Sequence, residues 1–264
     1  MLPAKGNLMS KKPATTNNIL FISDLHTPYQ HPDALRFLSA LKDKYNFKRV
    51  ISVGDECDWQ ALSYHDHNPD LKSAGDELQA AREVLHELWR IFPMMDIVES
   101  NHGSLAFRKA LTSGFPKHTI TSYADTVFGM RDKWGNLVRP KALGVGWRWH
   151  EKLIIDLGQG HQCMIVHGDG VPANTLNSVK QAGMSIIYGH HHSKFDVQYH
   201  STSEFLHFGM VIGCLIDPHS PAFDYGKKRV LARPIIGCGG YIDGNPRLFP
   251  MQLEKGGRWN GRVP

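Results

Sequence analysis

The chain has 264 residues, of which 41% are hydrophobic and 21% charged, and its 30 basic and 25 acidic side chains leave a formal net charge of +5. This composition excludes wholesale disorder, because a chain of this length and apolar content can bury a sizeable core. The mild positive charge permits a phosphate-rich partner without identifying one, and 16 histidines against four cysteines favour imidazole chemistry over a disulfide scaffold.

The start of the chain predicts a flexible tail over 1–17, followed by a single domain over 18–264. Residues 1–17 are polar and lack the apolar segment of a signal peptide. Apolar runs elsewhere are too short to span a bilayer. The cysteines are far apart and form no Cys-x-x-Cys pair, which is typical of free thiols in a reducing compartment. We therefore expect a soluble, cytoplasmic protein with no membrane partner.

Short apolar runs alternate with helical patterns through much of the chain. The runs are rich in β-branched residues and lack helical spacing, so they predict buried strands at 19–22, 50–53, 96–98, 164–166 and 185–188. Leucines at helical spacing behind Pro32-Asp33 predict a first helix. A second helix begins at the capping pattern of Ser73 and Asp76 and continues to Phe92. Weaker patterns favour helices after Asn101 and over 173–181.

The remaining segments favour strands and turns. Residues 153–157 and 162–166 flank Gly-Gln-Gly and predict a hairpin, and 195–253 has mostly strand character. Segment 112–149 shows no pattern beyond a loop with short elements. Within it, Trp147-Arg148-Trp149-His150 favours the anchor of a β-hairpin over a platform for stacking a base. An α/β first half that merges into a β-rich second half is the simplest fold.

Potential metal ligands follow five of the predicted strands. They are Asp24 and His26, Asp55 and Asp58, Asn101 and His102, His167 and Asp169, and the triplet His190-His191-His192. Each residue alone is also compatible with capping a turn or helix. Five such coincidences favour a site, because active-site crevices form at the carboxyl edge of an α/β sheet. Carboxylate, imidazole and amide ligands without thiolate suit Mn, Fe, Zn, Co or Ni.

In their order and spacing these motifs resemble those of the calcineurin-like metallophosphoesterases. The blocks are Asp24-Leu25-His26, Gly54-Asp55-Glu56-Cys57-Asp58, Ser100-Asn101-His102-Gly103, His167 and Gly189-His190-His191-His192. Two positions depart from the family pattern: Ser100 replaces a Gly, and Gly103 replaces an acid, which leaves the orientation of His102 open. The resemblance implies a four-layer α/β sandwich of two mixed sheets flanked by helices.

The resemblance also implies a centre of two divalent metal ions, with Mn²⁺ preferred and Fe, Zn, Co, Ni or Mg as alternatives. One ion would be held by Asp24, His26, Asp55 and His192. The other would be held by Asp55, as the bridge, with Asn101, His167 and His190. Ions about 3.5–4 Å apart lower the pKa of a shared water, and the resulting hydroxide would attack phosphorus while His102 protonates the leaving group.

Further residues are candidates for supporting this centre. Asp58 and Asp169 could orient metal-bound histidines, with turn capping as the alternative. His65, His67 and Arg108 lie near the motifs in sequence and are candidates for contacting a phosphate or base, with solvated surface as the alternative.

The substrate is expected to be a phosphate ester. The chain resembles small phage-encoded single-domain metallophosphoesterases, a group that includes a 5′-deoxyribonucleotidase, and this favours hydrolysis of (deoxy)nucleoside 5′-monophosphates, in the host cytoplasm if the protein is phage-encoded. The alternative is a nuclease or other phosphodiesterase acting on DNA or cyclic nucleotides, although a net charge of +5 is modest for a groove that contacts many phosphates. A third hypothesis is a non-catalytic nucleic-acid-binding or scaffold module that keeps the metals for stability. The oligomeric state stays open.

Overall fold

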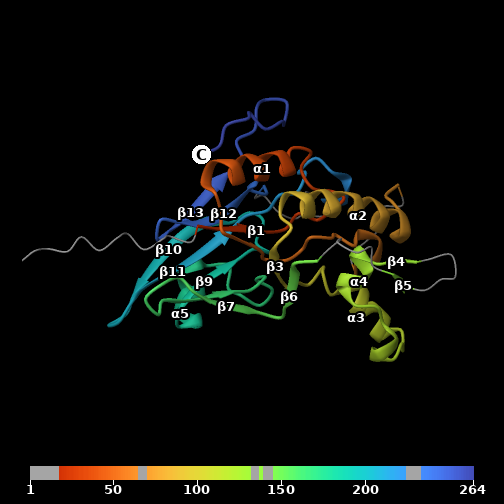
Figure 1. Cartoon of the computed structure of the whole chain (residues 1–264), viewed down its shortest axis with the longest axis horizontal. Coiled ribbons are helices and arrows are strands. Elements are labelled where there is room, and N and C mark those ends of the chain that lie inside the picture. The colour runs from red at the N-terminus through yellow and green to blue at the C-terminus, as the bar shows by residue number, and fades with distance from the viewer. Residues whose placement is uncertain (1–17, 65–69, 132–136, 139–144, 224–232) are drawn as a thin grey trace, which may run out of the picture.

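A computed structural model describes residues 18–64, 70–131, 137–138, 145–223 and 233–264. Its first sheet has six strands in the order β13-β12-β1-β2-β3-β6 (Figure 1). These strands are β1 (Ile19–Ile22), β2 (Arg49–Ser52), β3 (Met95–Val98), β6 (Trp147–His150), β12 (Gly237–Ile242) and β13 (Asn245–Pro250). Strands β1, β2, β3 and β6 run parallel, and β12 joins β1 antiparallel.

The second sheet has five strands in the order β10-β11-β9-β8-β7. Its strands are β7 (Leu153–Asp156), β8 (Gln162–Ile165), β9 (Ser185–Tyr188), β10 (Phe195–Ser201) and β11 (Leu206–Ile212). Strands β8, β9 and β11 are parallel, and antiparallel strands close both edges. Two short strands, β4 (Met130–Arg131) and β5 (Leu137–Val138), pair separately.

Helices cover the outer faces of both sheets (Figure 1). The helices are α1 (Ala34–Tyr45), α2 (Ala74–Ile91), α3 (Leu105–Thr112), α4 (Tyr123–Phe128) and α5 (Thr175–Ala182), with 3₁₀ turns at Gln60–Leu62, Lys117–Thr119 and Pro221–Phe223. In α2, the Ser73 hydroxyl accepts the N–H of Asp76 at 3.3 Å, which confirms the predicted cap.

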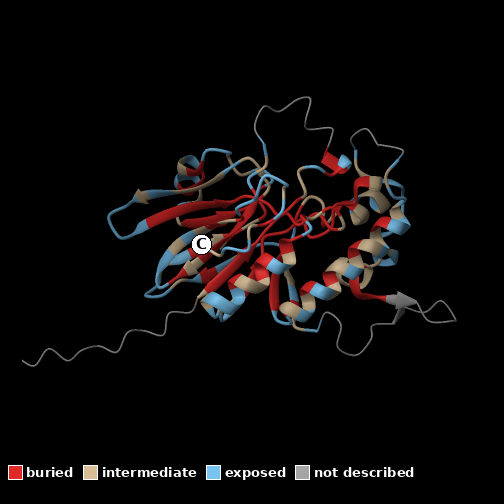
Figure 2. Ribbon diagram, turned by 90° about the horizontal axis from the view of Figure 1, so that it is seen from above, coloured by how far each residue is buried: buried red, intermediate tan, exposed pale blue. Residues whose placement is uncertain are grey.

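Successive side chains of β1 point to opposite faces of the first sheet and so belong to two different cores. Leu20 and Ile22 belong to the core under α1 and α2, whereas Ile19 and Phe21 belong to the core between the sheets. A third core joins α5 to the outer face of the second sheet, around Val179. Viewed from above, buried strands fill the middle while the helices turn exposed residues outward (Figure 2). The structure therefore confirms the predicted α/β sandwich of two mixed sheets flanked by helices.

Most local predictions in the second half are confirmed, and one is wrong. Strands β7 and β8 form the predicted hairpin, and Asp243-Gly244 forms a two-residue turn with φ of 49° and 81° between β12 and β13. The strand at Trp147–His150, however, anchors no hairpin. It pairs parallel with β3 at the edge of the first sheet, and the chain then crosses to the second sheet. Alternating aromatics indicate a strand but do not identify its partner.

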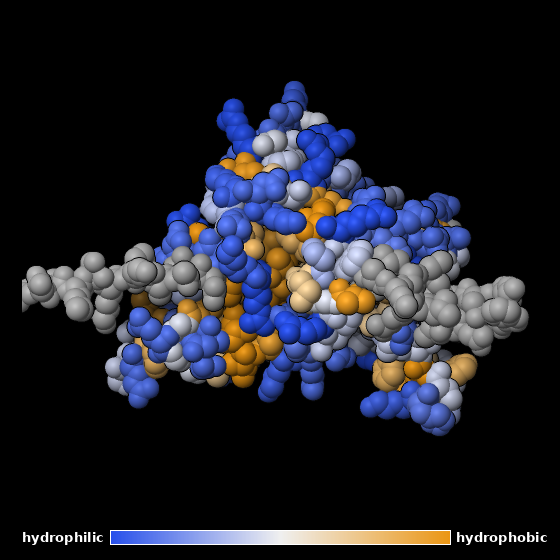
Figure 3. All heavy atoms as spheres, in the orientation of Figure 1, coloured by the Kyte–Doolittle hydropathy of each residue, from blue (hydrophilic) through white to orange (hydrophobic). Residues whose placement is uncertain are grey.

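The surface of the molecule is largely hydrophilic on the side shown in Figure 3. Hydrophilic side chains cover most of the face in Figure 3, and apolar residues show through in a band over β1, β9 and β7. Among the described residues, no helix combines the length and apolar character needed to cross a bilayer. All four cysteines are free and buried, as expected. The predicted tail over 1–17 lies outside the described residues.

Candidate metal centre

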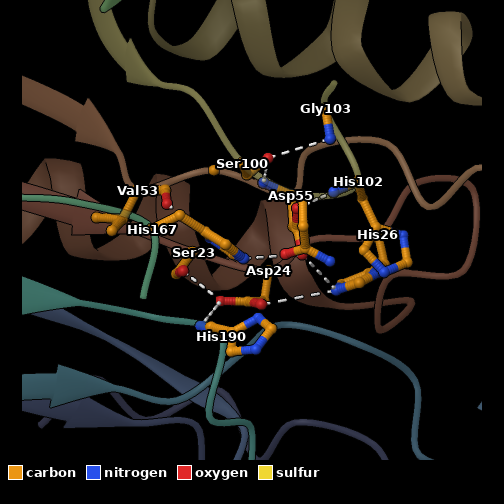
Figure 4. Close-up of polar contacts among 12 residues, drawn as sticks. Ser23, Asp24, His26, Val53, Asp55, Ser100, His102, Gly103, His167 and His190 are labelled. Carbon is orange, nitrogen blue, oxygen red and sulfur yellow. Dashed lines mark hydrogen bonds and ion pairs between the residues drawn. The ribbon is translucent and has the colours of Figure 1, made fainter. Parts of the chain in front are cut away.

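The sheet topology brings the five predicted strand ends together. Strands β1, β2 and β3 are parallel neighbours, and so are β8 and β9. The loops that follow each set therefore leave from one edge. In Figure 4 the side chains of Asp24, His26, Asp55 and His167 converge between these loops, with His190 close by.

Several of the predicted ligands have a left-handed backbone. The φ angles are 51° at Asp24, 49° at His26, 56° at Asp55 and 64° at His190. This conformation costs a non-glycine residue about 1–2 kcal/mol and concentrates at functional sites. Backbone hydrogen bonds join the first two loops, and among them the Asp24 N–H donates to the Gly54 carbonyl at 3.0 Å and the His26 N–H donates to the Asp55 carbonyl at 2.9 Å. The strain is thus held by contacts between the loops.

The first ligand cluster consists of Asp24, His26 and His192, whose candidate ligand atoms lie within 4.8 Å of one another. His192 Nε2 lies 2.8 Å from Asp24 Oδ1, and His26 Nε2 lies 3.6 Å from the same oxygen. These three residues belong to the set predicted for one ion.

The second cluster consists of Asp55, His167 and His190, again within 4.8 Å. His167 Nε2 lies 3.0 Å from Asp55 Oδ2, and the same carboxylate oxygen lies 3.6 Å from His26 Nε2 of the first cluster. Asp55 therefore stands between the two clusters, where the sequence predicts the bridging ligand.

Unpartnered atoms in this centre fit divalent metal ions. His26 Nε2, His167 Nε2 and Asn101 Oδ1 are buried and make no hydrogen bond with a described residue, and the two ring nitrogens face carboxylate oxygens at 3.0–3.6 Å. The other ring nitrogens are occupied: His26 Nδ1 lies 2.6 Å from Asp58 Oδ1, and His167 Nδ1 donates to the Val53 carbonyl at 2.9 Å. Metal-ligating histidines are oriented in this way, with the second nitrogen free to coordinate.

Burial and pairing shift the charges of the centre. Burial raises the pKa of Asp24, but the neighbouring His192 outweighs this effect and holds the pKa below its usual range. Burial likewise raises the pKa of Asp55, and the neighbouring His167 outweighs it and holds that pKa below its usual range. Burial lowers the pKa of His167, yet the charge of Asp55 raises it to about 10. The pKa of His26 is likewise raised, against its burial, by Asp24 and Asp58. Without metals, histidine protons therefore balance the buried carboxylates.

We expect metal binding to displace these protons. The raised pKa values of His26 and His167 favour protonation at pH 7 in the metal-free protein, and a histidine must be neutral to coordinate, so up to about two protons should leave when Mn²⁺ binds. Affinity should accordingly rise with pH. Titration calorimetry of Mn²⁺ in buffers of different ionisation enthalpy counts the protons, and H167Q should release about one fewer. Binding without proton release would exclude these histidines as ligands.

In the structure the His102 ring has a defined orientation, which the motif departures at Ser100 and Gly103 left open in the sequence. The ring Nδ1 of His102 contacts the Asp58 carbonyl, and the backbone N–H of His102 donates to Asp55 Oδ1 at 3.0 Å. Its ring is 4.7 Å from that of His26, centroid to centroid. Burial lowers the pKa of His102, and the charge of His26 adds to this against the opposing charge of Asp55. Asp58 thus orients two histidines, His26 with its carboxylate and His102 with its carbonyl.

The remaining predicted residues differ in where they lie relative to the centre. Arg108 is exposed, and its Nη2 donates to the carbonyl of Asn101 at 2.7 Å, which places it at the border of the centre. Asp169 is exposed and has no hydrogen bond or ion pair with a described residue. No contact among the described residues therefore supports its predicted role in orienting a histidine. His65 and His67 lie outside the described residues.

Sequence reasoning missed the small residues that pack around the ligands. The Ser23 hydroxyl donates to Asp24 Oδ2, and a Cβ added at Gly189 would lie 2.4 Å from the same oxygen. A signal was present, because serine or glycine directly precedes Asp24, Asp55, Asn101 and His190.

Comparisons with known proteins found similar solved structures. No family model and no curated protein matches the chain. Vacuolar protein sorting 29 from Cryptosporidium parvum is 17% identical over 94% of each chain, with a TM-score of 0.45. Yfce, a phosphoesterase from E. coli, is 16% identical over 85% of this chain and 87% of its own, with a TM-score of 0.37. Vps29 of Chaetomium thermophilum is 11% identical over 94% of each chain, with a TM-score of 0.41.

Proposed function

We propose that the protein is a metal-dependent phosphoester hydrolase whose preferred substrates are (deoxy)nucleoside 5′-monophosphates. One observation carries the proposal: Asp55 lies between two clusters of histidine and aspartate, and each cluster contains a buried histidine Nε2 that faces carboxylate oxygens without making a hydrogen bond. The other ring nitrogen of each of these histidines is occupied, by Asp58 in His26 and by the Val53 carbonyl in His167, which is how metal-ligating histidines are oriented. The donor types suit Mn²⁺ among several divalent ions, and the motif resemblance favours Mn²⁺ among them.

The metal ions, Arg108 and His102 would each have a separate role in hydrolysis. Two divalent ions bound here would supply Lewis-acid stabilisation of the phosphoryl oxygens and activation of a water. Arg108 presents an exposed guanidinium beside Asn101, where it can pair with a phosphate oxygen. His102 has its Nδ1 tied to the Asp58 carbonyl, so the cationic form of the ring carries its second proton on Nε2 and would give that proton to the leaving oxygen.

The choice of monoester over diester rests on the motif resemblance and on charge. A nuclease needs a basic groove that contacts many phosphates, and the excess of basic residues is only five over the whole chain. A non-catalytic module would not require an oriented His102. The held position of that ring therefore favours an enzyme.

The test uses protein shown to hold two Mn²⁺ per chain. We expect turnover of p-nitrophenyl phosphate, little turnover of bis-p-nitrophenyl phosphate, and a preference for 5′- over 3′-monophosphates in a nucleotide panel that includes single-stranded and duplex DNA. Turnover of the diester or of DNA alone would replace the proposal with a phosphodiesterase. No turnover of any substrate by the metal-loaded protein would overturn the catalytic function.

A further inference from the structure

Ser100, one of the two departures from the family pattern, lies buried against the centre. Its Oγ accepts the N–H of Asp55 at 2.8 Å and the N–H of Gly103 at 3.1 Å. Both contacts are visible in Figure 4. The hydroxyl therefore connects the loop after β2 to the turn after β3.

The Asp55 N–H needs this acceptor. Because Asp55 has a φ of 56°, its N–H is turned out of the sheet ladder, and the residue is buried. Its carboxylate meanwhile faces three histidines, accepting from the His102 N–H and approaching His167 and His26. A fixed backbone at Asp55 consequently fixes the carboxylate that lies between the two clusters.

Two glycines make room for the serine. A Cβ added at Gly103 would lie 2.8 Å from Ser100 Oγ, and its next nearest neighbours would be 3.8 Å away. A Cβ added at Gly54 would lie 2.5 Å from Ser100 Cβ. At Gly103 the serine hydroxyl is therefore the one atom that an added Cβ would approach too closely, so the two departures at 100 and 103 depend on each other.

We propose that Ser100 is a positioning residue of the metal centre: its hydroxyl holds the Asp55 backbone in the left-handed conformation, and Gly103 is required because that hydroxyl is present. This inference rests on the proposed metal site and deepens it. It predicts that side chains at 100 and 103 are coupled in their effect on metal affinity, although neither binds a metal.

The test is a double-mutant cycle read out by Mn²⁺ affinity. S100A removes the acceptor and should weaken Mn²⁺ binding about tenfold, in the range found for residues that orient metal ligands. G103A should weaken it by about the same factor, since the new Cβ displaces the hydroxyl from the Asp55 N–H. The double variant S100A/G103A should be no worse than S100A, because the obstacle to the Cβ is gone.

Control and spectroscopic measurements separate positioning from general damage. S104A removes a hydroxyl of the same turn that donates to the Ser100 carbonyl at 2.8 Å, and it should leave Mn²⁺ affinity unchanged. Electron paramagnetic resonance of the Mn²⁺-loaded protein should show weaker coupling between the two ions in S100A, whereas a loss of stability alone would not change this coupling.

Each outcome bears on a different statement. Additive losses of about a hundredfold in the double variant, or an S100A variant with unchanged affinity, would overturn the positioning role while leaving the metal site intact. A wild-type protein that binds no Mn²⁺ would overturn the metal site and the inference together.

Discussion

The D55N variant is expected to lose Mn²⁺ from both clusters and to lose turnover of p-nitrophenyl phosphate by about 10³-fold or more. Asp55 lies against both clusters, with Oδ2 at 3.0 Å from His167 Nε2 and 3.6 Å from His26 Nε2. An amide carries no charge and is a much weaker donor to a divalent ion than a carboxylate, so the D55N side chain should not hold the bridging position. Metal analysis after dialysis and steady-state rates measure both effects.

The same variant should change how stability depends on pH in the metal-free protein. Asp55 raises the pKa of His167 to about 10, above the unfolded value of about 6.5. The pair therefore stabilises the wild type fully below pH ~6.5, and this contribution is lost as pH rises toward ~10. In D55N the largest raising charge is gone while that of Asp24 remains, so this loss should become smaller. Thermal melts of both metal-free proteins between these pH values compare the slopes.

A matched control separates metal chemistry from folding. Asp96 is another buried carboxylate, paired with Arg49 and Arg148 and touching none of the predicted ligands. D96N should lower the melting temperature, because it leaves buried polar groups poorly paired, yet keep two Mn²⁺ per chain. If D55N itself retained two Mn²⁺, Asp55 would not be the bridge.

The strand ends were predictable because their signal is local. An apolar run followed by a ligand residue specifies both a buried strand and a polar side chain at its carboxyl end. Parallel pairing of β1 with β2 and of β2 with β3 then places Asp24, Asp55 and Asn101 on one edge without further information. The first-sheet ligands therefore follow from sequence pattern plus one rule of sheet topology, whereas the packing of the two sheets brings His167, His190 and His192 to them.

Contacts that depend on the backbone were not predictable in this way. Asp58 and Asp169 follow their nearest ligands at short spacing, yet Asp58 contacts His26 whereas Asp169 is exposed. The Nδ1 of His167 is occupied by the carbonyl of Val53, an atom that every residue carries. Similarly, the alternating aromatics of β6 predicted a strand, but its parallel partner β3 is decided by long-range packing.

The H102A variant is expected to keep both metal ions and to lose rate in proportion to how poor the leaving group is. A nucleoside 5′-monophosphate leaves as an alkoxide that needs a proton, so its turnover should fall about 10²–10⁴-fold. A p-nitrophenolate leaves without protonation, and its turnover should fall less than about tenfold. Rates on both substrates with one Mn²⁺-loaded sample give the ratio that tests the role.

The contacts of His102 explain why this ratio is informative. Its Nδ1 is tied to the Asp58 carbonyl, its ring lies beside His26, and it also belongs to a third group that could hold a metal, with His26 and Asp55. Loss of Mn²⁺ in H102A would make it a ligand, and equal losses on both substrates would make it a positioning residue. H161A removes a half-buried histidine whose Nε2 contacts the Ser185 hydroxyl at 2.8 Å, and it should change neither rate. A loss confined to the alkoxide leaving group therefore requires a proton delivered by His102.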